Sequence, residues 1–296
     1  MASRRGFYMG LLIMSSLLVS CGIAKKSNSS KEKSDEANDQ NMQNIAEEQT
    51  IQDGIMVEES EIVVAKAEVQ TENSTDRIMG IADIKQMAAG SVIEEAILES
   101  LVLDELFYLE EMNEDVKARI NGKSYKENCD VPYEDLRYIR VLHKNFEGKT
   151  QIGEMIVNKS IAEDVVDIFK ELYNTNYPIE RMVLVDEYDA DDNASMEANN
   201  TSAFNFRFID GTTKRSNHSD GLAIDINPRY NPYVRTIDGK QNVLPANGEE
   251  YADRSMDNPY YIRKDDICYK AFIKRGFTWG GEWKSSKDYQ HFQKDK

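Results

Sequence analysis

The sequence predicts an α+β domain that occupies the last two thirds of the chain. Of the 10 phenylalanines and 15 tyrosines, only Phe7 and Tyr8 precede Phe107, and no proline precedes Pro132. Aromatic side chains contribute much of the area that a core buries, so the folded part is expected in this later portion. There, amphipathic helical patterns and short apolar runs mix without the repeating strand–helix–strand order of a doubly wound sheet.

The 296-residue chain is strongly acidic, with a formal charge of −17 and a pI near 4.7. Nucleic-acid binding depends on Lys and Arg contacts to phosphate, so this balance argues against a nucleic-acid partner. The simplest interpretation is a solvated acidic surface that keeps the protein soluble.

Residues 1–20 are predicted to be a lipoprotein signal peptide. Arg4 and Arg5 form a positive region, and the apolar segment 9–19 is too short to cross a bilayer comfortably. The segment 18–22 (Leu-Val-Ser-Cys-Gly) resembles a bacterial lipobox, whereas a plain secretory signal would have a small residue in place of Leu18. We therefore expect Cys21 to carry a lipid that anchors the protein to the cell membrane, facing the extracytoplasmic side of a bacterium.

After Cys21, residues 21–85 are predicted to form a disordered acidic tether. They are rich in Ser, Asn, Gln, Lys and Glu and lack aromatic residues, so they cannot bury enough surface to offset chain entropy.

Residues 86–125 are predicted to be a helical segment that packs on the domain behind it. Between Ser91 and Ile120 the apolar residues recur at helical spacing, with acids on the other face, and Gly122 ends the pattern.

The remaining residues, 126–296, are predicted to form the main domain. Short strands are expected at 133–141, 155–157, 182–185 and 222–226, and a surface loop at 186–200. Ser160 and Glu163 form a capping-box pattern for a helix. The buried stripe of that helix is expected at Ile161, Val165, Ile168, Phe169 and Leu172.

Two motifs near the C-terminus carry candidate chemistry. Residues 216–225 contain His218 and Asp225, and residues 288–291 contain Asp288 and His291. A catalytic zinc site takes three ligands from His and Asp/Glu or Cys and leaves one position for water, while a further carboxylate acts as general base. This pattern indicates His218, Asp225 and His291 as ligands and Asp288 as the base. The third histidine, His143, has no acidic neighbours and is interpreted as structural.

The local pattern favours these assignments. Residues 222–226 alternate so that Leu222, Ile224 and Ile226 face the core, and an acid at position 225 would be costly unless paired or bound to metal. Asp288 and His291 would share a face in a helical turn, and in a loop they could still converge. Trp279 is expected in the core or cleft wall, and Cys129 and Cys268 could form a disulfide or remain free thiols.

The pattern Ser-x-His-x-x-Gly-x-Ala-x-Asp followed by Asp-x-x-His resembles the VanY/VanX-type family of zinc D-alanyl-D-alanine peptidases, which also holds L-alanyl-D-glutamate endopeptidases. The resemblance covers residues 120–296. It implies one Zn²⁺ per chain held by His218, Asp225 and His291, and Asp288 as acid/base for a zinc-bound water. The implied fold is Hedgehog/DD-peptidase-like, with a small central antiparallel sheet, flanking helices and zinc in the cleft. Aspartate rather than glutamate at position 288 is more like the endopeptidase branch.

The stretch 199–207 resembles the segment before the zinc motif in lipoprotein-type members. Family enzymes place an arginine near the scissile carbonyl or the substrate carboxylate, and Arg207 is the candidate here, with Arg215 and Arg181 as weaker alternatives. The candidate substrate contacts are Ser216, Ser202 and Trp283.

The resemblance implies a zinc-dependent peptidase that acts on peptidoglycan stem peptides as a D-alanyl-D-alanine carboxypeptidase, and we expect a monomer. One alternative is an L-alanyl-D-glutamate endopeptidase of the same family. The others are a non-catalytic zinc-containing lipoprotein that binds the wall, and a surface lipoprotein without metal.

Overall fold

The computed structural model describes residues 79–209 and 212–295. The predicted signal peptide, the predicted lipidation site Cys21 and most of the predicted tether lie outside the described residues. Within these two ranges, no helix has the length and apolar character needed to cross a membrane.

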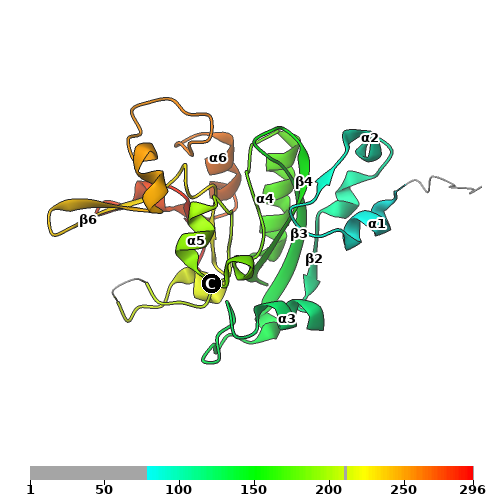
Figure 1. Ribbon diagram of the computed structural model, residues 1–296, viewed down its shortest axis with the longest axis horizontal. Coiled ribbons are helices and arrows are strands. Elements are labelled where there is room, and N and C mark those ends of the chain that lie inside the picture. Colours follow the sequence, from blue (N-terminus) through cyan, green and yellow to red (C-terminus); the bar gives the residue numbers. More distant parts are fainter. Residues whose placement is uncertain (1–78, 210–211, 296) are drawn as a thin grey trace, which may run out of the picture. The chain divides into compact units, whose positions relative to one another are not determined.

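A four-stranded antiparallel sheet in the order β1-β4-β3-β2 forms the larger layer (Figure 1). Its two long central strands are β3 (Leu136–Lys144) and β4 (Thr150–Asn158), and its edges are β1 (Val92–Ile93) and β2 (Tyr108–Glu111). The central strands pair over their full length, from Leu136 opposite Asn158 to Lys144 opposite Thr150. The strand predicted at 133–141 is shifted to 136–144, because residues 133–135 form a 3₁₀ turn instead. The strand predicted at 155–157 is longer, because β4 pairs with the whole of β3.

Helix α4 (Ala162–Asn174) packs against this sheet (Figure 1). All five residues of its predicted stripe are buried, which confirms that part of the prediction. The predicted capping box does not form, because the Ser160 hydroxyl donates to Asn158 Oδ1 and Ile161 is the N-cap residue. Helix α4 also contacts α6 (Ile267–Ile273), where the rings of Phe169 and Phe272 meet edge to face at 6.5 Å.

Two smaller antiparallel sheets carry the C-terminal motifs. One is β5-β10-β8, built from β5 (Ala223–Asp225), β10 (His291–Gln293) and β8 (Thr278–Trp279). The other is β7-β6-β9, in which the hairpin of β6 (Tyr233–Ile237) and β7 (Lys240–Leu244) extends outward and pairs with β9 (Lys287–Asp288) (Figure 1). The α+β class is therefore confirmed, whereas the Hedgehog/DD-peptidase-like fold stays a prediction.

The remaining elements are short helices. The α-helices are α1 (Ile81–Gln86), α2 (Glu95–Leu98), α3 (Glu114–Ile120) and α5 (Asp192–Glu197). The 3₁₀ helices are η1 (Leu103–Leu106), η2 (Tyr133–Asp135), η3 (Val185–Tyr188), η4 (Asn217–Asp220), η5 (Ala246–Tyr251) and η6 (Gly280–Glu282).

The prediction of a helical segment at 86–125 is wrong in two respects. The segment is divided into short helices, and β1 and β2 within it pair with β4 and β3 of the central sheet. Pairing with the sheet edges outweighs the local helical periodicity, and Gly90 turns the chain with a φ of 82°. The folded part also begins before residue 86, because Ile84 on α1 is 1% exposed, so the predicted tether boundary at 85 is wrong too.

The predictions for 182–200 also need correction. Residues 182–184 are mostly buried but do not form a strand. Met182 O accepts from Glu154 N of β4 at 3.1 Å, whereas the Asn200 side chain accepts from Val183 N and donates to Val183 O, both at 2.9 Å. The predicted surface loop at 186–200 contains η3 and α5, and Asp186 within it is buried and bonded to the backbone and hydroxyl of Ser124. Polar side chains that form hydrogen bonds to buried backbone groups cannot be told from loop residues by their sequence, so this segment was predicted as a loop.

The contact between α4 and α6 gives a stability prediction. Phe169→Ala should lower the free energy of unfolding by about 3–5 kcal/mol, because Phe169 is fully buried against both the sheet and Phe272. Urea unfolding followed by circular dichroism measures this. The control Asp167→Ala, at an exposed position on the same helix, should change it by about 0.5 kcal/mol or less. Equal effects of the two changes would contradict the packing.

Candidate metal centre

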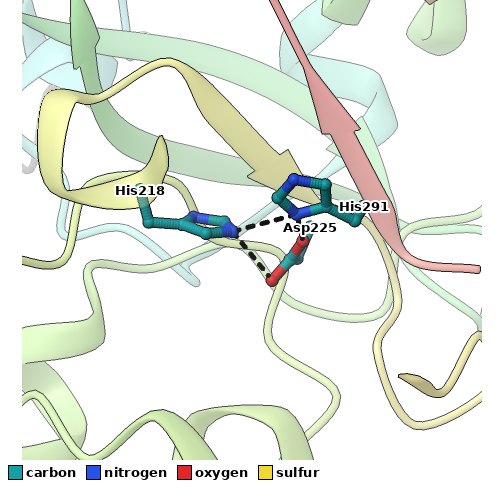
Figure 2. A group of neighbouring side chains, drawn as sticks. All are labelled: His218, Asp225 and His291. Carbon is teal, nitrogen blue, oxygen red and sulfur yellow. Dashed lines mark hydrogen bonds and ion pairs between the residues drawn. The ribbon is translucent and has the colours of Figure 1, made fainter. Parts of the chain in front are cut away.

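Three buried side chains converge where β5 ends and β10 begins (Figure 2). His218 comes from η4, Asp225 is the last residue of β5, and His291 is the first residue of β10. Asp225 and His291 are direct cross-strand partners, so their side chains leave the same face of the sheet. His218 approaches from the turn that precedes β5.

The potential ligand atoms of these residues lie close together. The His218 Nε2 atom is 3.2 Å from Asp225 Oδ2 and 3.2 Å from His291 Nδ1, which is 3.0 Å from Asp225 Oδ1 (Figure 2). A metal ion could be held by three or more His, Cys, Asp or Glu side chains that lie close together. Within residues 79–209 and 212–295, His218, Asp225 and His291 form such a group.

Hydrogen bonds on the outer side of each ring favour the tautomers that a metal requires. The Nδ1 atom of His218 is 2.6 Å from the carbonyl oxygen of Ala203, which only accepts, so Nδ1 carries the proton and Nε2 presents a lone pair. The Nε2 atom of His291 is 3.0 Å from Gln293 Oε1, which leaves Nδ1 for the metal. Such second contacts orient histidine ligands and raise their basicity.

Without a metal, these groups hold each other as an ion pair. Burial alone would raise the pKa of Asp225, but the neighbouring His218 and His291 hold that pKa well below its usual range. Burial opposes protonation of His291, yet its hydrogen bond to Asp225 and the charges of Asp225 and Asp288 raise its pKa to about 9. A divalent cation could replace the proton of this pair.

Asp288 lies on β9, not in a helical turn with His291, because the chain changes sheets between the two residues. Its Oδ1 atom is buried and has no hydrogen-bond partner within the described ranges. Burial raises its pKa to about 7, and the charge of Asp225 acts in the same direction, while His291 and Arg207 oppose the shift. Asp288 is therefore suited to exchange a proton near neutral pH.

Gly221, within the first motif, and Gly280, before the second, allow the backbone to pack closely around this centre. Gly221 ends η4 with a φ of 66°, and a Cβ there would lie 2.6 Å from Asn158 N. At Gly280 a Cβ would lie 2.8 Å from the Cβ of Asp288 and 3.3 Å from that of His291. A side chain at either position would displace the loop that carries a site residue.

Arg207 lies beside the centre and is held at both ends. The Ser219 hydroxyl accepts from Arg207 N at 2.8 Å and donates to Arg207 O at 2.6 Å, which ties its backbone to the turn that carries His218. Its guanidinium forms an ion pair of 2.8 Å with Asp192 at the start of α5. Of the alternatives, Arg215 pairs with Asp130 and Asp220, and Arg181 lines a different cavity.

The three candidate substrate contacts differ in their placement. Trp283 lines the cavity that surrounds the metal centre, with its ring 5.4 Å from that of His291. Ser216 also lines the cavity, and its hydroxyl accepts from His218 N. Ser202 is buried and pairs with Asp225 through its backbone, and it is not among the described residues that line the cavity.

The other sequence candidates lie away from the centre. His143 is buried in the core with Nδ1 2.8 Å from Ile179 O, and burial lowers its pKa to about 4, in agreement with a structural role. Trp279 is buried, and its indole donates to Tyr289 O. Cys129 and Cys268 are free thiols, so the disulfide alternative is excluded.

The cavity around the centre has a volume of about 720 Å³ and includes residues that the sequence did not reveal. One of them is Asp192, which the sequence placed in the predicted surface loop at 186–200. Two others are Tyr233 and Arg235, which lie in the β6–β7 hairpin, where the sequence has no catalytic or metal-binding motif. Of these residues, only Gln293 could have been predicted from the sequence. It follows His291 by two positions, and residues two apart on a strand lie on the same face.

Residues 210–294 match a family model described as D-alanyl-D-alanine carboxypeptidase. The matched segment includes the three residues of the metal centre and Asp288, and it is well under half of the chain. Comparison with curated proteins and comparison with solved structures each gave no match. Over residues 210–294 the chain is thus similar to D-alanyl-D-alanine carboxypeptidases, which supports the resemblance to the VanY-type peptidase family.

Proposed function

We propose that the protein is a zinc-dependent peptidase that cleaves peptidoglycan stem peptides, acting as a D-alanyl-D-alanine carboxypeptidase. The observation that carries this proposal is the convergence of His218, Asp225 and His291 in a cavity that also contains Asp288. The family match of residues 210–294 supports a peptidase.

The donor set fits zinc. Catalytic zinc sites use three protein ligands, and two histidines with one acid are a known set, at bond lengths of about 2.0–2.2 Å. Tetrahedral coordination at these lengths separates neighbouring ligand atoms by roughly 3.4 Å, and the observed separations are 3.0–3.2 Å. Little rearrangement would be needed to accept the ion.

When bound, zinc would supply a Lewis acid that makes a water molecule reactive near neutral pH. The carboxylate of Asp288 would accept the proton of the attacking water and then donate it to the nitrogen of the leaving amine. A pKa near 7 suits both steps, because both forms of Asp288 are populated near neutral pH. The guanidinium of Arg207 would stabilise the negative charge that develops on the carbonyl oxygen.

The place of action is proposed from the first 22 residues of the sequence. A lipid on Cys21 would anchor the protein to the membrane on the extracytoplasmic side, where peptidoglycan is accessible. The acidic chain is proposed to act as a monomer without a nucleic-acid partner.

The endopeptidase alternative has one structural observation in its favour. Arg207 is already paired with Asp192, so its charge is partly compensated before any substrate carboxylate arrives. A wall-binding protein without catalysis is less favoured, because binding alone would not require the buried carboxyl of Asp288 beside the metal centre.

The cleaved bond can be identified directly. The protein is incubated with muropeptides that end in D-Ala-D-Ala, with and without a chelator, and the products are identified by mass. We expect chelator-sensitive release of one terminal alanine. Cleavage between L-Ala and the D-Glu-linked residue would assign the endopeptidase activity, and one bound zinc per chain without cleavage would favour the binding protein.

Asp288→Asn should reduce kcat by about 10²–10⁴-fold, the usual contribution of a general acid/base. Zinc content, measured by elemental mass spectrometry, should be unchanged because Asp288 is outside the proposed ligand set. Asp238→Asn, at an exposed position of the β6–β7 turn, is the control and should keep full activity. Loss of zinc together with activity would instead make Asp288 a ligand.

The metal-free protein should become less stable as pH rises from 6 to 9. The folded pKa values of His291, about 9, and Asp288, about 7, both exceed their ordinary values. Folding therefore retains protons that the unfolded chain has released, and this stabilisation is lost as pH rises. Urea unfolding at a series of pH values tests this. Zinc should oppose the decline, because metal binding strengthens as its ligands lose protons. Constant or rising stability of the metal-free form would contradict the protonated ion pair.

A further inference from the structure

A second cavity, of about 790 Å³, opens beside the central strands β3 and β4. Its lining comes from those strands, from α3, and from the segments 86–91 and 180–188. It shares no described residue with the cavity of the metal centre, and its lining residues lie outside the segment 210–294 that matches the family model. Pockets for small molecules usually have volumes of about 300–1,000 Å³. This cavity is therefore a separate candidate site.

A buried ion network forms one wall of this second cavity. Arg140 on β3 and Glu154 on β4 are direct cross-strand partners, so their side chains leave the same face of the sheet. Glu154 is 1% exposed, and its two oxygens accept from Arg119 Nη1 at 2.9 Å and Nη2 at 2.6 Å. The Tyr138 hydroxyl also donates to Glu154. One carboxylate is thus shared between two guanidinium groups.

This carboxylate is ionised. Burial alone would raise the pKa of Glu154, but the hydrogen bonds from Arg119 and Tyr138 and the charges of Arg119 and Arg140 lower that pKa below its usual value. The network therefore contains two positive charges and one negative charge near neutral pH.

Arg140 is buried, yet its guanidinium is not fully hydrogen-bonded. The residue is 8% exposed and lines the cavity. Its Nη1 atom donates to the Tyr138 hydroxyl at 3.2 Å, and its Nη2 atom donates to Met87 O at 2.7 Å. Its Nε atom is buried and has no hydrogen-bond partner within the described ranges. Buried polar atoms almost always have a partner, so this donor indicates that a ligand oxygen or a water molecule accepts there.

The other charged residues of the cavity lie in more exposed positions than Arg140 and Glu154. Glu187 is exposed and already accepts from Arg119 at 3.1 Å, and Arg181, also exposed, carries the opposite charge. Glu180 is half-buried and accepts from Asn199 Nδ2 at 2.6 Å. Water and salt screen exposed charges more than buried ones. The positive excess of the buried network therefore favours an anion over a cation in this cavity.

We propose that this cavity binds a small organic anion, whose carboxylate or phosphate group accepts a hydrogen bond from Arg140. The inference does not depend on the proposed peptidase function. Charge-assisted hydrogen bonds to a guanidinium are among the stronger ones in proteins. The side-chain amides of Gln86 and Gln151 also line the cavity and can donate to, or accept from, the rest of the molecule. A water molecule would satisfy the Nε atom but would supply no negative charge.

The test measures the Tm of the zinc-loaded full chain in chloride, acetate and phosphate at equal pH and ionic strength. A ligand that binds only the folded state raises Tm, and at about five times its Kd the expected rise is roughly 2–4 °C. Arg140→Gln removes the cation, and Ala89→Leu enlarges a half-buried residue of the cavity wall without changing the ion network. Both variants should lose most of the rise. The control Lys126→Gln removes an exposed cation that is not among the described lining residues, and it should keep the rise.

The two anions identify the group that is bound. A larger rise in acetate would indicate a carboxylate ligand, a larger rise in phosphate a phosphate ligand, and either result supports the inference when Arg140→Gln abolishes it. Phosphate also stabilises folded proteins without a specific site, and that part of its effect would remain in every variant.

No rise in either anion over chloride would overturn the inference. The wild-type rise in a folded Arg140→Gln variant would overturn it too, because the anion would then bind elsewhere. If circular dichroism shows that Arg140→Gln does not fold, Ala89→Leu decides. Loss of the rise in Ala89→Leu would support the inference, and the full rise would contradict it.

Discussion

The pairing of β5 with β10 is the constraint on which the candidate site depends. It places Asp225 opposite His291 on one face and Ile224 opposite Phe292 on the other. Ile224 and Phe292 are fully buried, and the Phe292 ring stacks on Phe272 with centroids 4.1 Å apart. A slip of one residue would turn the polar pair into the core and the apolar pair out of it. Core packing therefore fixes the register, and the register brings the potential ligands together.

A second register, between β6 and β9, places Asp288. Only two residues separate β9 from β10, so the chain leaves one sheet and enters the next within the Asp-x-x-His motif. This crossing is held by the Trp279 indole, which donates to Tyr289 O at 2.9 Å, and by Ile226 N, which donates to Gln290 O at 3.1 Å. The motif spacing thus reflects two sheets that share one cavity.

The sequence predicted the polar centre better than its surroundings, for physical reasons. Burying an acid in the apolar run 222–226 costs free energy unless the acid is paired or binds a metal. Asp225 and the nearby His218 could therefore be predicted as site residues from the sequence alone. The N-terminal strands β1 and β2 were missed because edge pairing with distant β4 and β3 leaves no local signal. Asp192 and Arg235 were not predicted to lie near the site, because their positions in the cavity depend on contacts that only folding provides.

The two carboxylates of the cavity show how their surroundings separate chemical roles. Asp225 has a histidine on each oxygen, which holds its pKa low and keeps it ionised, as a metal ligand must be. Asp288 has a buried oxygen without a described donor, and burial raises its pKa to about 7. Carboxylates whose pKa values are driven apart can act as a ligand and as a proton carrier in one site. The division of labour proposed from the motifs thus has a physical cause in the contacts of each side chain.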